Sequence, residues 1–155
     1  ADTMIHDIDN FFHSSLNAFA HSSHFALTCR FHVFPEDVKL SDNLFHGFYN
    51  TYVRVLNTLG MGMGRGECQM VRSEVFSKVK GYNEMLAAGE DYDLYRRIKL
   101  HGAGKIKFLN DLLVYESPRR YRKFGYMKVF GDWTKNSFSV FFKNRSVSKV
   151  WEAVR

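Results

Sequence analysis

The sequence predicts an α/β fold, because segments with helical and strand periodicity alternate along one chain. Apolar residues recur every three or four positions over residues 4–20, whereas they alternate with polar residues from Phe25 to Val33. The 155 residues are 45% hydrophobic and 16% aromatic, so the chain can bury a core of its own. The predicted order is helix, strand, helix, strand, helix, helix, strand, strand and helix, which gives a mixed sheet flanked by helices.

The first half of the chain supplies the first four of these elements. Residues 4–20 predict an amphipathic helix, and the strand that follows ends at Pro35. Ser41 is the expected N-cap of the second helix, and Gly60 is its expected C′ residue. The glycine-rich segment "GMGMGRG" then predicts a flexible loop that leads into a short strand at residues 67–71.

The second half begins with a short helix from Ser73, its expected N-cap, to Val79. The segment "KGYNE" predicts a turn, and the next helix starts at Glu90. Residues 105–109 and 112–117 predict two short strands. Aromatic residues at helical spacing among basic residues predict a helical C-terminal tail.

Positive charge is concentrated in this tail. Residues 119–155 hold ten Lys and Arg and two acids, whereas the first 118 residues hold twelve basic and fourteen acidic side chains. We therefore expect a first unit at residues 1–118 and a basic, aromatic extension at residues 119–155. The segment "RRYRKFGYMK" has three interpretations: a solvated basic surface, a nucleic-acid patch, or cations for a diphosphate. The absence of any nucleic-acid-binding motif argues against the second.

Other classes of protein are disfavoured by what the sequence lacks. It has no apolar run of about 18 residues, as a membrane-spanning helix would need. Cys29 and Cys68 have no metal-ligand spacing, and the histidines form no zinc motif. We expect both cysteines to be reduced and buried, as in a cytoplasmic protein.

Three carboxylates at the start of the predicted fourth helix are the first candidate site. Glu90, Asp91 and Asp93 follow Gly89 directly. Acids favour helix N-termini, so helix capping explains them without any further role. Alternatively, adjacent acids raise one another's pKa, which suits a general base facing a cleft.

The glycine loop is the second candidate site. It contains G-x-G, but it lies between a helix and a strand, the reverse of the order that a dinucleotide-binding loop requires. Two interpretations remain open: a mobile loop that lines an acceptor site, and an ordinary surface loop.

Four segments in series give a resemblance over residues 60–120. They are the glycine-rich loop, "RSEVF" at residues 72–76, "KGYNE" at residues 80–84 and "EDYDL" at residues 90–94. Their order and spacing resemble the second half of family-2 glycosyltransferases, which have the A-type (GT-A) nucleotide-sugar fold. Lys80 departs from the pattern, which has a glycine there. Ala1-Asp2-Thr3 is similar to the end of the family's Asp-x-Asp element.

The resemblance implies a partial GT-A fold and roles for particular residues. Asp91 would be the general base of an inverting transfer, and Glu90 would orient it or the acceptor. Asp2 would be a ligand of a divalent metal, Mg or Mn, and the remaining implied site residues bind substrate: Gly64, Gly66, Glu67 and Cys68 at the acceptor, and Arg119 and Arg120 at the diphosphate.

The implied function is transfer of a sugar from a nucleotide-diphospho-sugar to a carbohydrate or lipid-linked acceptor, in synthesis of cell-surface polysaccharide or glycolipid. The nucleotide-binding half would then precede Ala1, and the basic tail would face the inner surface of the membrane. Two hypotheses from other classes remain. A non-catalytic interaction module would bind anionic partners through the tail, and a nucleic-acid-binding domain would rest on that tail alone.

Overall fold

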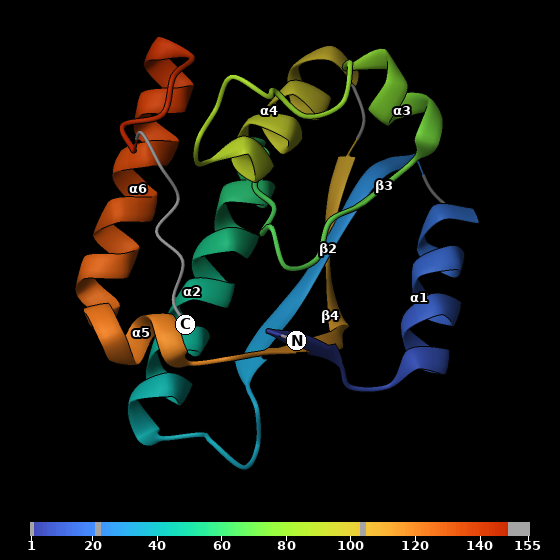
Figure 1. The fold of residues 1–155 in the computed structure, drawn as a ribbon. Helices are drawn as coiled ribbons and strands as arrows, with labels where there is room; N and C mark the ends of the chain where they lie inside the picture. The colour runs from blue at the N-terminus through green and yellow to red at the C-terminus, as the bar shows by residue number, and fades with distance from the viewer. Residues whose placement is uncertain (1, 21–22, 103–104, 149–155) are drawn as a thin grey trace.

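The computed structural model describes residues 2–20, 23–102 and 105–148, which form a mixed sheet with helices on both sides (Figure 1). The described strands are β1 (Thr3–Ile5), β2 (His24–Val33), β3 (Met70–Val71) and β4 (Lys105–Glu116), in the order β1-β4-β2-β3. The central strands β2 and β4 are parallel, and each outer strand is antiparallel to its neighbour. The predicted α/β class is thereby confirmed.

Helices cover both faces of the sheet, and successive residues of β2 contact helices on opposite faces. The described helices are α1 (Ile8–Ala20), α2 (Leu40–Thr58), α3 (Ser73–Lys78), α4 (Glu90–Gly102), α5 (Arg119–Phe124) and α6 (Tyr126–Lys143). Figure 1 shows α1 on one side of β2 and β4, with α2, α4 and α6 on the other. Leu27 clusters with Phe11 of α1, whereas its neighbour Ala26 clusters with Leu94 and Ile98 of α4. The period-two pattern of the sequence thus separates two cores.

The first helix begins at Ile8, later than predicted, because residues 3–5 pair with β4 instead. Asp7 starts the helix. Its carboxylate accepts a hydrogen bond from the backbone N–H of Asn10 at 2.9 Å, and its carbonyl accepts one from Phe11. Apolar spacing could not show this boundary, because Ile5 fits either element.

Both predicted serine caps are wrong by one or two positions. The residue before α2 is Lys39, and the Asp42 carboxylate accepts its backbone N–H at 2.7 Å, so Ser41 lies inside the helix. Arg72 precedes α3 in an extended conformation, and Ser73 is the first helical residue. In each case the carbonyl of the residue before the helix accepts a backbone N–H from the first turn, that of Asp42 for α2 and that of Val75 for α3, both at 3.0 Å.

β3 is shorter than the predicted strand over residues 67–71. The Cys68 N–H donates to the Arg65 carbonyl at 3.1 Å, so this part of the glycine-rich segment turns back on itself. Only Met70 and Val71 then pair with β2.

β4 is one strand where two were predicted. Cys29 of β2 pairs with Leu109, but the next residue, Arg30, pairs with Leu113. Residues 110–112 are therefore extra residues that form a step in β4. Such a bulge accommodates extra residues without ending the strand. The polar pair at its centre, Asn110 and Asp111, is what made the sequence look like two strands.

The C-terminal tail is helical as predicted, but Gly125 divides it into α5 and α6. Its φ of +83° lies in the left-handed region that favours glycine. Both helices join α2 and α4 in one apolar cluster, whose buried members are Phe45, Tyr49, Val53, Met63, Leu86, Tyr92, Tyr121, Val129 and Val140. The unit boundary predicted at residue 118 stays a prediction.

The segment after α6 folds back along it. The Asn136 side chain accepts the backbone N–H groups of Val147 and Ser148 at 2.9 and 3.0 Å. The Ser146 hydroxyl accepts the N–H of Ala87 at 3.2 Å. The end of the described chain is therefore joined to the loop that precedes α4.

Candidate functional site

A cavity of about 360 Å³ lies between the glycine-rich loop, the start of α4 and α6. The loop contributes Gly66 and Glu67, α4 contributes Glu90 and Asp91, and α6 contributes Trp133. The structure therefore brings four of the predicted site residues to one cavity. α6 was not predicted to take part, because nothing in its sequence links it to the carboxylates.

Each of the three carboxylates at the start of α4 has its own environment. Glu90 is exposed, and Asp91 is half-buried at the cavity. Asp93 is only 3% exposed and accepts a hydrogen bond from the Arg97 guanidinium at 2.7 Å. Arg97 also donates to the Gly81 carbonyl at 2.7 Å, so Asp93 holds the "KGYNE" turn rather than facing the cavity.

The Asp91 carboxylate is poised to exchange a proton near neutral pH. Burial raises its pKa to about 7, and the negative charges of Glu67 and Glu90 act in the same direction. Backbone hydrogen bonds from Tyr92 and Gly66 oppose the shift, the former at 2.7 Å. A group with this pKa can accept a proton at neutral pH and release it afterwards.

Two residues that the sequence did not indicate hold Asp91 in place. The Gln69 side chain donates to the Asp91 carbonyl at 2.9 Å, and the Tyr82 hydroxyl donates to Gln69 at 2.8 Å. They connect the segment before β3, the turn after α3 and the start of α4. No motif predicts this link, because its members lie far apart along the chain.

Arg65 is the main residue of the site that sequence reasoning missed. It is 2% exposed, and its Nη2 donates to Glu116 at 2.7 Å and to Glu67 and the Tyr121 hydroxyl at 3.3 Å. Its guanidinium carbon lies 4.1 Å from the centre of the Phe31 ring, in cation–π geometry. Its Nη1 has no hydrogen-bond partner in the described part of the chain.

Glu116 is the buried partner of Arg65 at the end of β4. Burial raises its pKa to about 7, although the Arg65 guanidinium and the Tyr121 hydroxyl, at 2.8 Å, favour the charged form. His46 lies beside it, with Nδ1 3.5 Å from Oε1. Burial lowers the pKa of His46 to about 3, so this histidine is neutral under ordinary conditions.

The glycine-rich loop approaches α4 too closely for side chains. A Cβ at Gly62, whose φ is +73°, would lie 2.7 Å from the Tyr95 carbonyl oxygen. A Cβ at Gly64 would lie 2.7 Å from the Tyr95 ring. The Asn57 amide fixes the loop further, bonding both backbone groups of Met63 at 2.7 Å. The loop that the sequence predicts to be flexible therefore follows a defined path along α4.

Cys68 and Gly64, both predicted to bind substrate, do not line the cavity. Cys68 is 8% exposed and belongs to the apolar cluster that also contains Cys29. Both thiols are free and buried, as predicted. A hydrogen bond with Cys68, together with burial, raises the pKa of Cys29 far above its ordinary value.

The remaining predicted residues lie near the end of β4, outside the cavity lining. The Asp2 carboxylate forms an ion pair with Arg119, and its carbonyl accepts the Ser117 N–H at 2.9 Å. The Arg120 guanidinium lies 6.0 Å from the centre of the Phe124 ring. The structure therefore places Asp2 beside Arg119, but it does not join them to Asp91.

The resemblance implies a divalent metal at Asp2, and such a metal needs several oxygen ligands. Within residues 2–20, 23–102 and 105–148, no group of three or more His, Cys, Asp or Glu is placed to hold a metal ion. Asp2 alone, already paired with Arg119, does not make such a site. The metal stays a prediction of the resemblance.

Comparison with known proteins gave no match to a family model, to a curated protein or to a solved structure. Among the described helices, none is long and apolar enough to cross a membrane.

Proposed function

We propose that this chain contains the acceptor side of an inverting glycosyltransferase with a GT-A fold, in which Asp91 is the general base. The observation that carries the proposal is the Asp91 carboxylate, which lines a cavity of about 360 Å³ with a pKa raised to about 7 by burial. Inverting transfer needs a base that takes the proton of the acceptor hydroxyl as that oxygen attacks the sugar's anomeric carbon. The resemblance of residues 60–120 supplies the reaction class.

The other groups of the cavity suit a carbohydrate acceptor. Glu67 and Glu90 can accept hydrogen bonds from hydroxyl groups, and the Trp133 ring offers a flat apolar face. Gly66 leaves the backbone open beside Asp91, because a Cβ there would lie 3.5 Å from the Asp91 Oδ2. Arg119, near the end of β4, stays the proposed contact for the donor's diphosphate.

The test is Asp91→Asn in the protein produced from its complete reading frame. Release of nucleoside diphosphate is measured with a panel of nucleotide-diphospho-sugars and acceptors in the presence of Mg or Mn. We expect a fall of at least about 100-fold, because general bases contribute roughly that much or more. In the wild type, the rate should rise with pH through about 7 as Asp91 ionises.

Asp111→Asn is the matched control, because Asp111 is exposed on β4 and does not line the cavity. It should keep full activity. If Asp91→Asn is as active as this control, Asp91 is not the base. If no donor is turned over by the wild type, the proposed reaction itself is wrong.

We also propose that the outer face of α6 contacts a membrane surface. Phe138 and Phe142 are stacked and are 55% and 70% exposed. Lys135 and Lys143 are on the same helix, and the tail as a whole is strongly basic. Exposed aromatic residues beside cations are typical of helices that lie in the interface of an anionic membrane.

A further inference from the structure

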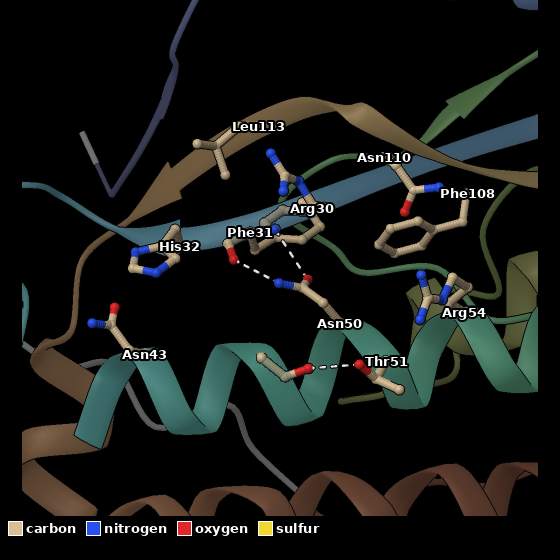
Figure 2. Close-up of a pocket in the computed structure, with 11 residues that line it drawn as sticks. Arg30, Phe31, His32, Asn43, Asn50, Thr51, Arg54, Phe108, Asn110 and Leu113 are labelled. Atoms are coloured by element: carbon tan, nitrogen blue, oxygen red, sulfur yellow. Dashed lines mark hydrogen bonds between the residues drawn. The ribbon is translucent and has the colours of Figure 1, made fainter. Parts of the chain in front are cut away.

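A second cavity, of about 350 Å³, lies between α2 and the two central strands (Figure 2). β2 contributes Arg30 and His32, α2 contributes Asn50 and Arg54, and β4 contributes Asn110, each with neighbouring residues. Among the described residues, none lines both this cavity and the one at Asp91. The proposed glycosyl transfer makes no use of it.

The charge of this cavity is positive and uncompensated. The guanidinium groups of Arg30 and Arg54 are exposed, and neither forms an ion pair or hydrogen bond with a described residue. No Asp or Glu is among the lining residues. Asp111, the acid next to Asn110 on β4, is exposed and outside the lining. The cavity therefore offers two free cations to an anion.

Hydrogen bonds join α2 to β2 at this cavity. The Asn50 amide donates to the Phe31 carbonyl at 2.9 Å and accepts the Phe31 N–H at 3.1 Å. These two bonds satisfy the backbone N–H and C=O of Phe31, which lies beyond Ala26 and Leu27, the residues of β2 that pair with β3. Figure 2 shows this link across the cavity, with Arg54 extending from α2 toward Phe108 and Asn110. The step in β4 at residues 110–112 lies opposite the point of β2 between Cys29 and Arg30.

Polar groups and open space surround the cations. The side-chain amides of Asn43 and Asn110 make no hydrogen bond to other described residues, so both can serve a ligand. Gly47 lines the cavity in the middle of α2, and a Cβ added there would meet nothing within 4 Å. Glycine weakens a helix interior, yet here it leaves the cavity floor open.

We propose that this cavity binds a phosphate ester of a small hydroxylated molecule. Guanidinium groups bind phosphate through paired, charge-assisted hydrogen bonds, which suits Arg30 and Arg54. The amides of Asn43 and Asn110 suit the hydroxyl groups of the ester, and the ring of Phe108 suits its apolar face. The volume matches a compact ligand of the size of a sugar phosphate.

The test is a ¹H–¹⁵N NMR titration of the chain with glucose 6-phosphate, inorganic phosphate and glucose as separate probes. Glucose 6-phosphate should shift the amide signals of Asn50, Thr51 and Asn110. It should bind at least about tenfold more tightly than either other probe, because both halves of the ester make contacts. Arg30→Gln and Arg54→Gln should each weaken this binding by about tenfold or more.

Matched controls separate a built site from general charge attraction. Lys135→Gln removes an exposed charge from α6, which does not line this cavity, and should change the affinity less than twofold. Gly47→Met should block binding. Gly131→Met should not, although Gly131 is also a helical glycine with nothing within 4 Å.

Three outcomes would overturn the proposal. They are shifts spread over the basic tail, equal affinity for the ester and for inorganic phosphate, and equal effects of the arginine and Lys135 variants. Because Arg30 and Arg54 are exposed, loss of fold does not confuse the result, and thermal unfolding of each variant checks this.

Discussion

At the scale of single residues, Glu90, Asp91 and Asp93 differ through the groups that surround them. Asp93 is paired with Arg97 at 2.7 Å, and Glu90 is exposed to water. The Asp91 carboxylate has no cation partner among the described residues and is shielded from water, so burial destabilises its charged form and raises its pKa. Asp91 therefore accepts the Tyr92 N–H at the start of the helix and is also the group suited to proton exchange, whereas Asp93 holds Arg97.

The free energy of unfolding should depend on pH, because the buried Asp91 carboxylate is destabilised when it ionises. Its pKa is about 7 in the folded protein and near 4 when unfolded, so the folded state holds the proton more tightly. Stability from this group is fully present below pH 4 and is lost as pH rises to 7. Asp91→Asn should therefore be roughly 2–4 kcal/mol more stable than the wild type above pH 7.

Urea unfolding of both proteins between pH 4 and pH 8 measures this difference. It should grow with pH and become constant above about pH 7. Glu116, whose pKa is also raised by burial, affects both proteins equally. A difference that does not change with pH would show that the Asp91 pKa is not raised.

The sequence predicted part of this site. Glu90 and Asp91 are adjacent, and Gly66 and Glu67 are adjacent, so each pair formed a visible motif. Arg65 was missed because its partner Glu116 is 51 positions away. A lone arginine beside a glycine gives no periodic signal. Long-range ion pairs of this kind are set by tertiary packing, which local patterns do not record.

At the scale of elements, the predicted types were largely right and their boundaries less so. Strong periodicity identified α2 and α4, which each bury one face, and β2, in which apolar residues alternate with others along the strand. The extra strand β1 was missed, since three residues are too few to show a pattern. The loop from Gly60 to Gly66 was recognised by composition, but its fixed path depends on contacts with α4.

Gly62→Ala should therefore destabilise the protein. The new Cβ would lie 2.7 Å from the Tyr95 carbonyl oxygen, at a φ of +73° that alanine rarely adopts. We expect a loss of about 2 kcal/mol or more in unfolding free energy. Gly131→Ala in α6 is the matched control and should gain up to about 1 kcal/mol, because nothing lies within 4 Å. Urea unfolding of both variants measures these values, and equal effects would disprove the close contact.

At the scale of the whole molecule, α1 and α6 lie on opposite sides of the sheet (Figure 1), and each presents exposed apolar side chains. α1 presents Phe12 and Leu16, which are 56% and 66% exposed. α6 presents Phe138 and Phe142 within the basic tail. The two faces differ in charge, so binding to anionic membranes should distinguish them.

Vesicles that contain phosphatidylglycerol provide the measurement. The double variant Phe138→Ser with Phe142→Ser should bind them at least about tenfold more weakly than the wild type. Raised salt should weaken wild-type binding, because salt ions screen the attraction between the tail's cations and the anionic lipids. Phe12→Ser with Leu16→Ser should bind like the wild type. If the two double variants behave alike, α6 is not the membrane face.

The contacts of Arg65 also determine when the site can form during folding. Its partners Glu116 and Tyr121 are 51 and 56 positions further along the chain. Contacts that join distant segments require closure of long loops, so they form late and slowly. During synthesis, a chain that has not reached Tyr121 leaves the Arg65 charge without these partners. The cavity at Asp91 is therefore complete only after α6, which also lines it, has left the ribosome.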